Sequence, residues 1–281
     1  MYYISKQIRG VAQPGSASGL GPEGRRFKSC RPDHVYIMSK NKFRYLNYYY
    51  WLRKLSFSRL FQNFFFLSDT YKRKVVFNSI YNSNHWRDYN KPKNNESVSG
   101  LGSDLTNNSS LVNNVKNFIS EFKIKKILDL GCGDFNWMKH IVLNNNNITS
   151  YLGLDIVDKI INLNNLNYQN NKILFKTNDV LFEDLPDSYD LIIIRDLFIH
   201  LKNDEILKVI KKINNSTIKF LAVTSYPTSE ININTNRFGH HRYINMELDP
   251  FYLDGPFKIF DDNENQHNPR KLYIYNINEN S

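Results

Sequence analysis

The stretch Ile-Leu-Asp-Leu-Gly-Cys-Gly-Asp at residues 127–134 constrains the fold more than any other part of this 281-residue chain. Its apolar start predicts a short buried strand over residues 127–130. Gly131 and Gly133 then predict a tight turn, because glycine adopts left-handed backbone angles and lets a ligand come close to the main chain. A glycine turn of this kind after a strand is typical of nucleotide-binding α/β folds.

Apolar strands alternate with helical segments along the rest of the chain. The strong hydrophobicity of residues 189–194 indicates a central parallel strand. Further strands are expected at 151–155, 173–176 and 218–224, a closing antiparallel pair at 257–260 and 272–277, and helices at 111–122, 136–143 and 204–213. We therefore expect an α/β fold: a Rossmann-like, doubly wound, mostly parallel seven-stranded sheet with ligands at the carboxyl ends of its strands. The Asn clusters at 144–147 and 261–268 indicate surface loops.

Cysteine content and charge exclude several classes of protein. The two cysteines are too few for a disulfide framework or a complete zinc site, and no apolar run reaches membrane-spanning length. The net charge is +10, but residues 1–75 hold 15 Lys/Arg against 3 Asp/Glu, whereas residues 76–281 hold 22 against 24. The larger part is therefore close to neutral, and the net charge says little about the substrate. We expect a cytoplasmic protein.

Composition divides the chain into three parts. Residues 1–37 contain no Asn and resemble a translated transfer-RNA gene, so we expect a non-native leader with translation starting at Met38; the alternative is a disordered arm. Residues 38–75 are basic and aromatic, and we expect a helical segment that packs on the main domain or on a second subunit. Contact of this segment with an anionic membrane surface is the alternative. Residues 76–281 form the main domain.

Acidic residues at the strand ends narrow the choice of ligand. Asn136 stands where a dinucleotide fingerprint has its third glycine. Asp129 would repel a pyrophosphate and attract an ammonium group. Asp155 ends the second strand, where a carboxylate is suited to the two hydroxyls of a ribose, and Asp179 follows the third strand, near an expected adenine amino group. This order of acids favours S-adenosylmethionine over a dinucleotide.

These motifs resemble those of the Rossmann-like (class I) S-adenosylmethionine-dependent methyltransferases. Residues 129–133 are similar to the family's first motif, although Phe135 stands where the common pattern has its last glycine. Other segments between residues 76 and 277 resemble a largely uncharacterised bacterial subgroup. The resemblance implies S-adenosyl-L-methionine as the cofactor. The cofactor contacts expected are Asp129, Gly131, Cys132, Gly133, Asp134, Asp155, Ile156, Asp179, Val180 and Arg195.

Candidate catalytic residues follow the fourth strand. Arg195 and Asp196 come directly after it, and His200 lies four residues beyond Asp196. On a helix this spacing would place the carboxylate beside the imidazole, so that Asp196 orients or charges His200. His200 is then a candidate base for a hydroxyl or amino acceptor. The alternative is that this run only shapes the cofactor pocket.

Candidate acceptor contacts lie in other segments. The composition of the Gly/Ser-rich stretch at 97–103 is compatible with a lid over the cofactor or with a flexible linker, and the family resemblance favours the lid. No metal site is expected, and Tyr226 is expected to end the fifth strand. The acceptor contacts expected are Trp86, Ser103, Trp137, His240, His241 and Arg242.

The function that these features favour is methyl transfer to a small-molecule or sugar-containing acceptor. No Asn/Asp-Pro-Pro-aromatic motif of amino-methylating DNA enzymes is present, and no Pro-Cys pair offers a nucleophile for methylation of cytosine carbon 5. Two alternatives remain open. One is an RNA methyltransferase that holds RNA with its basic segment 40–75. The other is a non-catalytic module that binds the cofactor or its demethylated product.

Overall fold

The computed structural model describes residues 68–86, 97–104, 109–262 and 269–277, which all belong to one compact unit of the chain, residues 59–281. The expectations for residues 1–37 and for the aromatic and basic run over 40–67 lie outside the described residues. Among the helices of the described ranges, none is long and apolar enough to cross a membrane.

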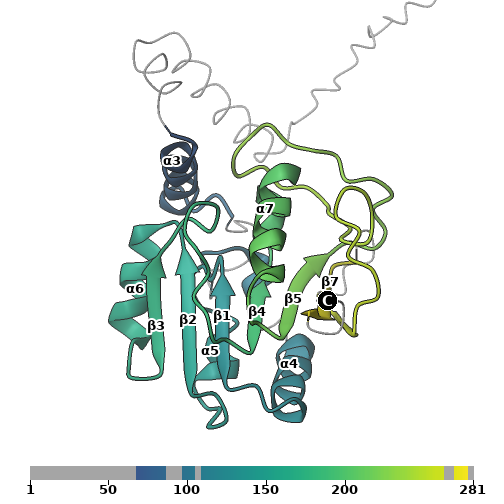
Figure 1. The fold of residues 1–281 in the computed structure, drawn as a ribbon. Coiled ribbons are helices and arrows are strands. Elements are labelled where there is room, and N and C mark those ends of the chain that lie inside the picture. The colour runs from purple at the N-terminus through teal and green to yellow at the C-terminus, as the bar shows by residue number, and fades with distance from the viewer. Residues whose placement is uncertain (1–67, 87–96, 105–108, 263–268, 278–281) are drawn as a thin grey trace, which may run out of the picture. The chain divides into compact units, whose positions relative to one another are not determined.

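One seven-stranded sheet forms the centre of this unit, in the order β3-β2-β1-β4-β5-β7-β6 (Figure 1). The strands are β1 (Lys126–Leu130), β2 (Ser150–Asp155), β3 (Ile173–Thr177), β4 (Leu191–Ile194), β5 (Phe220–Ser225), β6 (Lys258–Asp261) and β7 (Lys271–Asn276). The first five are parallel, and β7 runs antiparallel to both β5 and β6. The expected mostly parallel sheet with a closing antiparallel pair is therefore confirmed.

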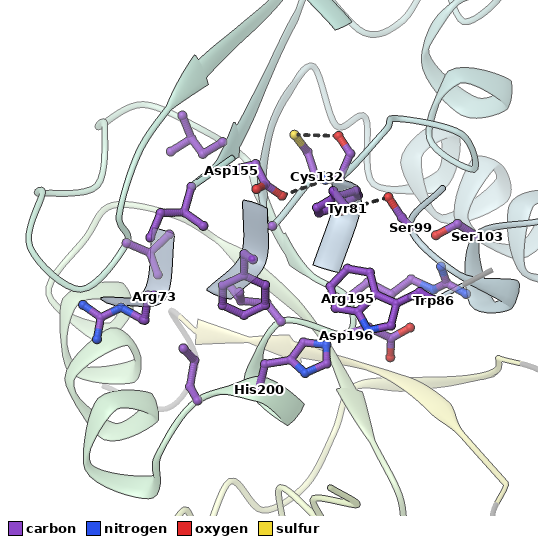
Figure 2. Close-up of a pocket in the computed structure, with 18 of the residues that line it drawn as sticks. Arg73, Tyr81, Trp86, Ser99, Ser103, Cys132, Asp155, Arg195, Asp196 and His200 are labelled. Carbon is purple, nitrogen blue, oxygen red and sulfur yellow. Dashed lines mark hydrogen bonds between the residues drawn. The ribbon is translucent and has the colours of Figure 1, made fainter. Parts of the chain in front are cut away.

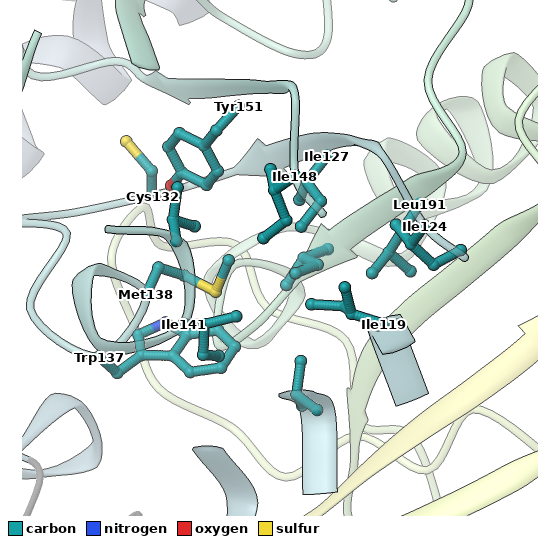
Figure 3. Packing of buried hydrophobic residues seen from close by; sticks show 14 of the residues in the cluster. Ile119, Ile124, Ile127, Cys132, Trp137, Met138, Ile141, Ile148, Tyr151 and Leu191 are labelled. Atoms are coloured by element: carbon teal, nitrogen blue, oxygen red, sulfur yellow. The ribbon is translucent and has the colours of Figure 1, made fainter. Parts of the chain in front are cut away.

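Helices cover both faces of the sheet. The helices are α3 (Asp69–Asn82), α4 (Ser109–Glu121), α5 (Lys139–Val142), α6 (Asp158–Tyr168) and α7 (Asn203–Asn214), with short 3-10 turns η1 (Leu101–Ser103) and η3 (Phe198–His200). Side chains alternate along each strand. In β1, Ile127 joins a core with α4, α5 and α6, whereas Leu128 and Leu130 join a second core with α7. Figure 3 shows part of the first core, which includes Tyr151 and Met138.

The helix expected over residues 136–143 is shorter than predicted, because α5 begins only at Lys139. Turns precede it, where polar side chains bind neighbouring main chain instead of leaving the backbone to form a helix. Asn136 Nδ2 donates to the carbonyl of Ser103 at 2.7 Å, and the Asn136 amide donates to the Asp134 carboxylate at 3.3 Å. These contacts draw the start of the segment towards the 97–104 loop.

Phe135, which replaces the last glycine of the expected pattern, keeps a glycine-like backbone. Its φ is 60°, in the left-handed region that a bulky residue rarely adopts. The ring is fully buried against Tyr151, Tyr168 and Phe175, with ring centroids 4.9, 5.3 and 5.0 Å away. Aromatic packing therefore holds a strained backbone in place at the start of the segment that leads into α5.

Replacing Phe135 by glycine should lower the free energy of unfolding by about 2–4 kcal/mol. Loss of a buried phenylalanine costs about 3–5 kcal/mol, and relief of the left-handed backbone returns about 1 kcal/mol. Urea unfolding followed by circular dichroism measures the difference. Tyr252→Gly is the matched control, because Tyr252 has φ 46° but is 63% exposed. The packing account is wrong if both variants stay within about 1 kcal/mol of the parent.

Candidate functional site

A cavity lies at the carboxyl ends of β1, β2, β3 and β4 (Figure 2). The neighbours β1 and β4 mark the point where the strand order reverses, which is where open α/β sheets bind ligands. Side chains of α3 and of the 97–104 loop line the cavity as well. In Figure 1, α3 lies beyond the ends of the sheet towards which the arrows of β2 and β3 point.

The glycine turn after β1 has the conformation that its sequence indicates. Gly131 and Gly133 have φ of 75° and 54°, and both line the cavity. A Cβ on Gly133 would lie 2.4 Å from the hydroxyl oxygen of Ser99. The amides of Gly131 and Cys132 donate to the carbonyl of Leu154 at 2.8 and 3.0 Å, which ties the turn to β2. Because Gly133 has no side chain, the 97–104 loop lies close to the backbone of this turn.

Asp155, at the end of β2, faces the cavity as a partly satisfied carboxylate. One oxygen accepts from the amide of Gly133 at 3.1 Å and the other from the amide of Val157 at 3.0 Å. Burial raises the pKa of Asp155 to about 6, against the lowering effect of these amide donors. The Ile156 amide also acts on this carboxylate, but a carboxylate accepts up to about four hydrogen bonds, so Asp155 keeps acceptor capacity for the hydroxyls of a ribose.

Asp129 does not lie among the described residues that line the cavity. Its side chain is only 2% exposed and accepts a hydrogen bond of 2.6 Å from the Tyr151 hydroxyl. Burial raises the pKa of Asp129 to about 7, although the Tyr151 hydrogen bond lowers it. The expected direct attraction between this acid and a ligand ammonium therefore gains no support from its position, because Asp129 points into the protein.

Asp134 also lies outside the cavity lining and fixes the 97–104 loop instead. Its carboxylate accepts from the hydroxyl of Ser97 at 2.8 Å, and its amide donates to the hydroxyl of Ser99 at 3.0 Å. The loop is thereby held over the glycine turn, where Ser99 and Ser103 line the cavity. This placement agrees with the expectation that the Gly/Ser-rich segment covers the ligand site.

Asp179 lines the cavity but is already engaged by Arg73 of α3. The Arg73 guanidinium donates to Asp179 at 2.8 Å and to Glu205 at 2.9 Å, and all three side chains are buried. Phe77 and Tyr81 follow Arg73 at spacings of four along α3, and all three line the cavity. Sequence reasoning missed these residues, although their spacing places them on one face of a helix.

The predicted pairing of Asp196 with His200 is wrong. Asp196 has φ 61° and is not helical, and η3 includes only the last three residues of this run. The Asp196 carboxylate instead forms a short ion pair with Arg270 and accepts from the Thr224 hydroxyl at 3.4 Å. The i, i+4 geometry fails because the chain leaves β4 through a left-handed residue, which turns the Asp196 side chain towards β5 and β7.

His200 lines the cavity as a neutral ring. It stacks on Trp86 with ring centroids 5.3 Å apart and an interplanar angle of 16°, and meets the edge of Phe77 at 5.8 Å. Burial lowers the pKa of His200 to about 4, with the charge of His241 lowering it further. Nδ1 lies 3.4 Å from the carbonyl of His240, which only accepts, so the proton is on Nδ1 and Nε2 has the lone pair.

Arg195 lines the cavity and is held by a second buried acid. Its Nε and Nη2 atoms each donate to Asp262 at 2.7 Å, and Nη2 also donates to the carbonyl of Gly102 at 2.5 Å. The guanidinium carbon lies 4.8 Å from the ring centroid of Trp137, which lines the cavity too. Asp262 belongs to a stretch that the sequence assigned to a surface loop, and its burial corrects that prediction.

The segment after β5 lines a neighbouring cavity, which includes His240, His241 and Arg242. The His241 ring lies 6.4 Å from that of His200, but His241 is not among the residues that line the first cavity. Arg242 is buried, and its guanidinium donates to Asn203 at 2.6 Å and to the carbonyls of Ile233 and Leu201. These contacts give Arg242 a structural role, and its expected contact with a substrate stays a prediction.

The first cavity thus gathers most of the expected cofactor contacts and half of the expected acceptor contacts. Those that line it are Gly131, Cys132, Gly133, Asp155, Ile156, Asp179, Val180, Arg195, Trp86, Ser103 and Trp137, together with the candidate catalytic residues Asp196 and His200. In the part of the chain that the structure describes, no group of three or more His, Cys, Asp or Glu side chains is arranged to hold a metal ion.

Comparison with known proteins agrees with this arrangement. Residues 127–217 match the model of a methyltransferase domain family. The phosphoethanolamine N-methyltransferase of Plasmodium falciparum is 32% identical over 102 residues, which cover 34% of this chain and 38% of that enzyme. The match therefore spans well under half of the curated relative's length.

Solved structures share the fold. The magnesium protoporphyrin IX methyltransferase of Synechocystis with bound S-adenosylmethionine superposes with a TM-score of 0.52 and 17% identity, covering 74% of this chain and 97% of that one. The same enzyme with bound S-adenosylhomocysteine (SAH), the demethylated form of the cofactor, gives a TM-score of 0.52 over 73% of this chain and 99% of that one. Residues 127–217 are therefore similar to a methyltransferase domain, and the chain shares the fold of an enzyme whose structures hold S-adenosylmethionine or its demethylated product.

Proposed function

We propose that this chain transfers a methyl group from S-adenosylmethionine to a small-molecule or sugar-containing acceptor that has a hydroxyl or amino group. The observation that carries the proposal is the continuity of one cavity. The glycine turn and Asp155 line its cofactor half, and Trp86, Asp196 and His200 line the rest. Donor and acceptor would thus meet in one site, and alignment of reacting groups supplies much of the acceleration of a displacement.

The cofactor half fits S-adenosylmethionine in its chemistry. Asp155 retains acceptor positions for the ribose hydroxyls, while Ile156 and Val180 offer apolar contacts on which a purine ring packs. When bound, S-adenosylmethionine supplies a methyl group on a positively charged sulfur. The protein's own contribution is to hold that group against the acceptor side and to limit water there, which the aromatic side chains of α3 and Trp86 favour.

The acceptor half favours a small molecule over a nucleic acid. Its described walls include the rings of Trp86, Trp137 and His200, and the arginines that line the cavity, Arg73 and Arg195, are paired with buried carboxylates. Binding of a nucleic-acid backbone depends on several cations directed at its successive phosphates. The partial similarity to a phosphoethanolamine N-methyltransferase also supports a small acceptor. The RNA alternative depends on the basic segment 40–75, of which residues 40–67 lie outside the described residues and residues 69–75 belong to α3.

Transfer of labelled methyl groups tests this proposal. The purified chain is incubated with S-adenosylmethionine labelled in its methyl group and an extract of the source cells, which is then separated into small molecules, RNA and protein. We expect label in the small-molecule fraction. Label in RNA that disappears on deletion of residues 38–67 would support the RNA alternative, and absence of label from every fraction would support a non-catalytic binding module.

His200→Phe should lower turnover about fivefold and leave the affinity for SAH unchanged. The phenyl ring keeps the stacking on Trp86 but removes Nε2, and one hydrogen bond is worth about 1 kcal/mol. With its pKa near 4, His200 is a weak base, so we expect it to orient the acceptor as a hydrogen-bond acceptor.

The pH dependence separates these two roles of His200. Because the imidazole is neutral above about pH 5, turnover of the parent protein should show no step near pH 6.5 that His200→Phe removes. A step that disappears in His200→Phe would mean that the imidazole titrates during catalysis. Equal turnover of parent and variant would mean that the ring only fills space.

A further inference from the structure

A buried ion network lies beside the acceptor half of the cavity and centres on Asp262, directly after β6. The Asp262 side chain is 0% exposed. Its two oxygens accept from Arg195 at 2.7 Å each, and one of them also accepts from Arg270 Nη2 at 2.8 Å. Because charge-assisted bonds to a guanidinium fix its plane, a single carboxylate orients two arginines here.

Arg270 connects this network to the cavity. Its Nη1 donates to the Asp196 carboxylate in a short ion pair, and its Nε donates to the carbonyl of Asp262 at 3.1 Å. The Asp262 amide in turn donates to the Arg270 carbonyl at 3.0 Å. Main chain and side chain of the β6–β7 pair therefore fix the Arg270 guanidinium together, and Arg270 has little freedom to follow Asp196 if Asp196 moves.

The position of Asp196 is determined from several directions. Its backbone has the left-handed φ of 61°, and its amide donates to the Thr224 hydroxyl at 3.0 Å. Gly102 packs on the ion pair so closely that a Cβ there would lie 2.6 Å from Arg270 Nη1 and 3.1 Å from Asp196 Oδ2. Backbone strain of this kind persists only where surrounding contacts impose it, and it is concentrated at functional sites.

Asp196 nevertheless remains accessible to a ligand. Its side chain is 26% exposed and lines the cavity beside His200. One oxygen is engaged by Arg270, and the contact of the other with Thr224 is long, at 3.4 Å. Because each carboxylate oxygen accepts more than one hydrogen bond, Asp196 has acceptor capacity for a donor in the cavity.

We propose that Asp262 is a positioning residue for methyl transfer: through Arg270 it holds the Asp196 carboxylate where that group accepts a hydrogen bond from the hydroxyl or amino group of the acceptor. This inference rests on the proposed function. It also narrows the acceptor class, because a molecule without a hydrogen on its reacting oxygen or nitrogen has nothing to donate to Asp196.

Methyl transfer to the acceptor breaks one bond at the methyl carbon and releases one proton. The lone pair of the acceptor oxygen or nitrogen forms a bond to the methyl carbon while the carbon–sulfur bond breaks and its electron pair returns to sulfur. The acceptor's proton passes along its hydrogen bond to the Asp196 carboxylate and then to solvent, which reaches this partly exposed side chain. Asp196 ends the cycle ionised and paired with Arg270, so Asp262 contributes no proton of its own.

Asp262→Asn tests the inference, with Asp261→Asn as the matched control. Asp261 is the preceding residue, and its side chain is 68% exposed and paired with Lys271 at the surface. In Asp262→Asn the uncharged amide cannot orient both guanidiniums, so we expect methyl transfer into the small-molecule extract to fall about 100-fold at saturating S-adenosylmethionine. The affinity for SAH, measured by calorimetry, should stay within about threefold of the parent. Asp261→Asn should match the parent in both measurements.

Arg270→Lys provides a second test that does not depend on the folding of Asp262→Asn. Lysine keeps the positive charge but cannot bind both acids through a planar fork, so turnover should fall about tenfold with SAH affinity retained. Parental turnover in both Asp262→Asn and Arg270→Lys would overturn this inference and leave the proposed function standing. Variants that lose SAH affinity and turnover equally would show a structural role and also overturn it. A parent protein that labels no fraction would contradict the proposed function and, with it, this inference.

Discussion

Asp155→Ala should weaken the binding of SAH about 100-fold or more. A hydrogen bond to a charged group contributes about 1.5–3 kcal/mol, and two ribose hydroxyls together would lose at least about 3 kcal/mol. The substitution also removes the acceptor of the Gly133 amide and thus loosens the turn that lines the cavity. Titration calorimetry with SAH measures the change.

Two other acids show whether the effect belongs to the position of Asp155 or to negative charge in general. Asp158, on α6, is an exposed acid paired with Lys74, and Asp158→Asn should leave the affinity unchanged. Asp129→Asn should change the affinity less than about fivefold, because Asp129 binds Tyr151 outside the cavity lining. If Asp129→Asn weakens binding as much as Asp155→Ala does, Asp129 attracts the cofactor from its buried position.

The pH dependence of binding follows from the same carboxylate. With the pKa of Asp155 raised to about 6, the ionised form that accepts from ribose hydroxyls is depleted as the pH falls through 6. The affinity of the parent for SAH should therefore drop about tenfold between pH 7.5 and pH 5. In Asp155→Ala this part of the pH dependence should be absent, and its persistence would assign it to another group.

Sequence reasoning succeeded where a short motif fixes both conformation and place. The glycine turn and Asp155 are local features, because a strand end and a left-handed turn are specified by a few neighbouring residues. The alternation of apolar strands likewise predicted the sheet, since buried parallel strands leave a strong pattern. The same reasoning placed Asp179 in the cavity, although nothing nearby in the sequence revealed its partner Arg73, 106 residues away.

Sequence reasoning failed where side-chain geometry depends on distant contacts. The spacing of Asp196 and His200 predicted a helical pair, but Arg270 binds Asp196 from 74 residues away and the backbone is left-handed at Asp196. Asp262 carried no local signal at all, because it lies in a polar, Asn-rich stretch that is typical of a surface loop. A buried ion network has no sequence period, so its members become visible only when the fold brings them together.

Arg73→Met should lower the free energy of unfolding by about 3–5 kcal/mol, the largest effect on stability that we expect. The substitution leaves Asp179 and Glu205 buried without the cation that compensates them, and breaking a buried ion pair from one side costs this much. For a chain of this size the melting temperature should fall by about 10 °C. Lys208→Met is the matched control, since Lys208 pairs with Asp204 at the surface and should contribute less than about 1 kcal/mol.

A double variant distinguishes uncompensated charge from lost packing in Arg73→Met. Combining Arg73→Met with Glu205→Gln should recover part of the loss, because one of the two unpaired charges is then absent. A deficit that is unchanged in the double variant would assign the effect to packing of the arginine stem on Phe182 and Phe238.

Arg73→Met should also affect the cavity, because α3 forms part of its wall. Arg73 forms the buried ion pairs of α3, and Phe77 and Tyr81 on the same face line the cavity. If the buried pairs anchor the helix, Arg73→Met should make α3 more susceptible to proteolysis than the sheet. Saturating SAH should restore part of the protection, because a ligand that binds only while α3 lines the cavity stabilises that state. Cleavage in α3 at the parental rate would mean that aromatic packing alone holds the helix on the cavity.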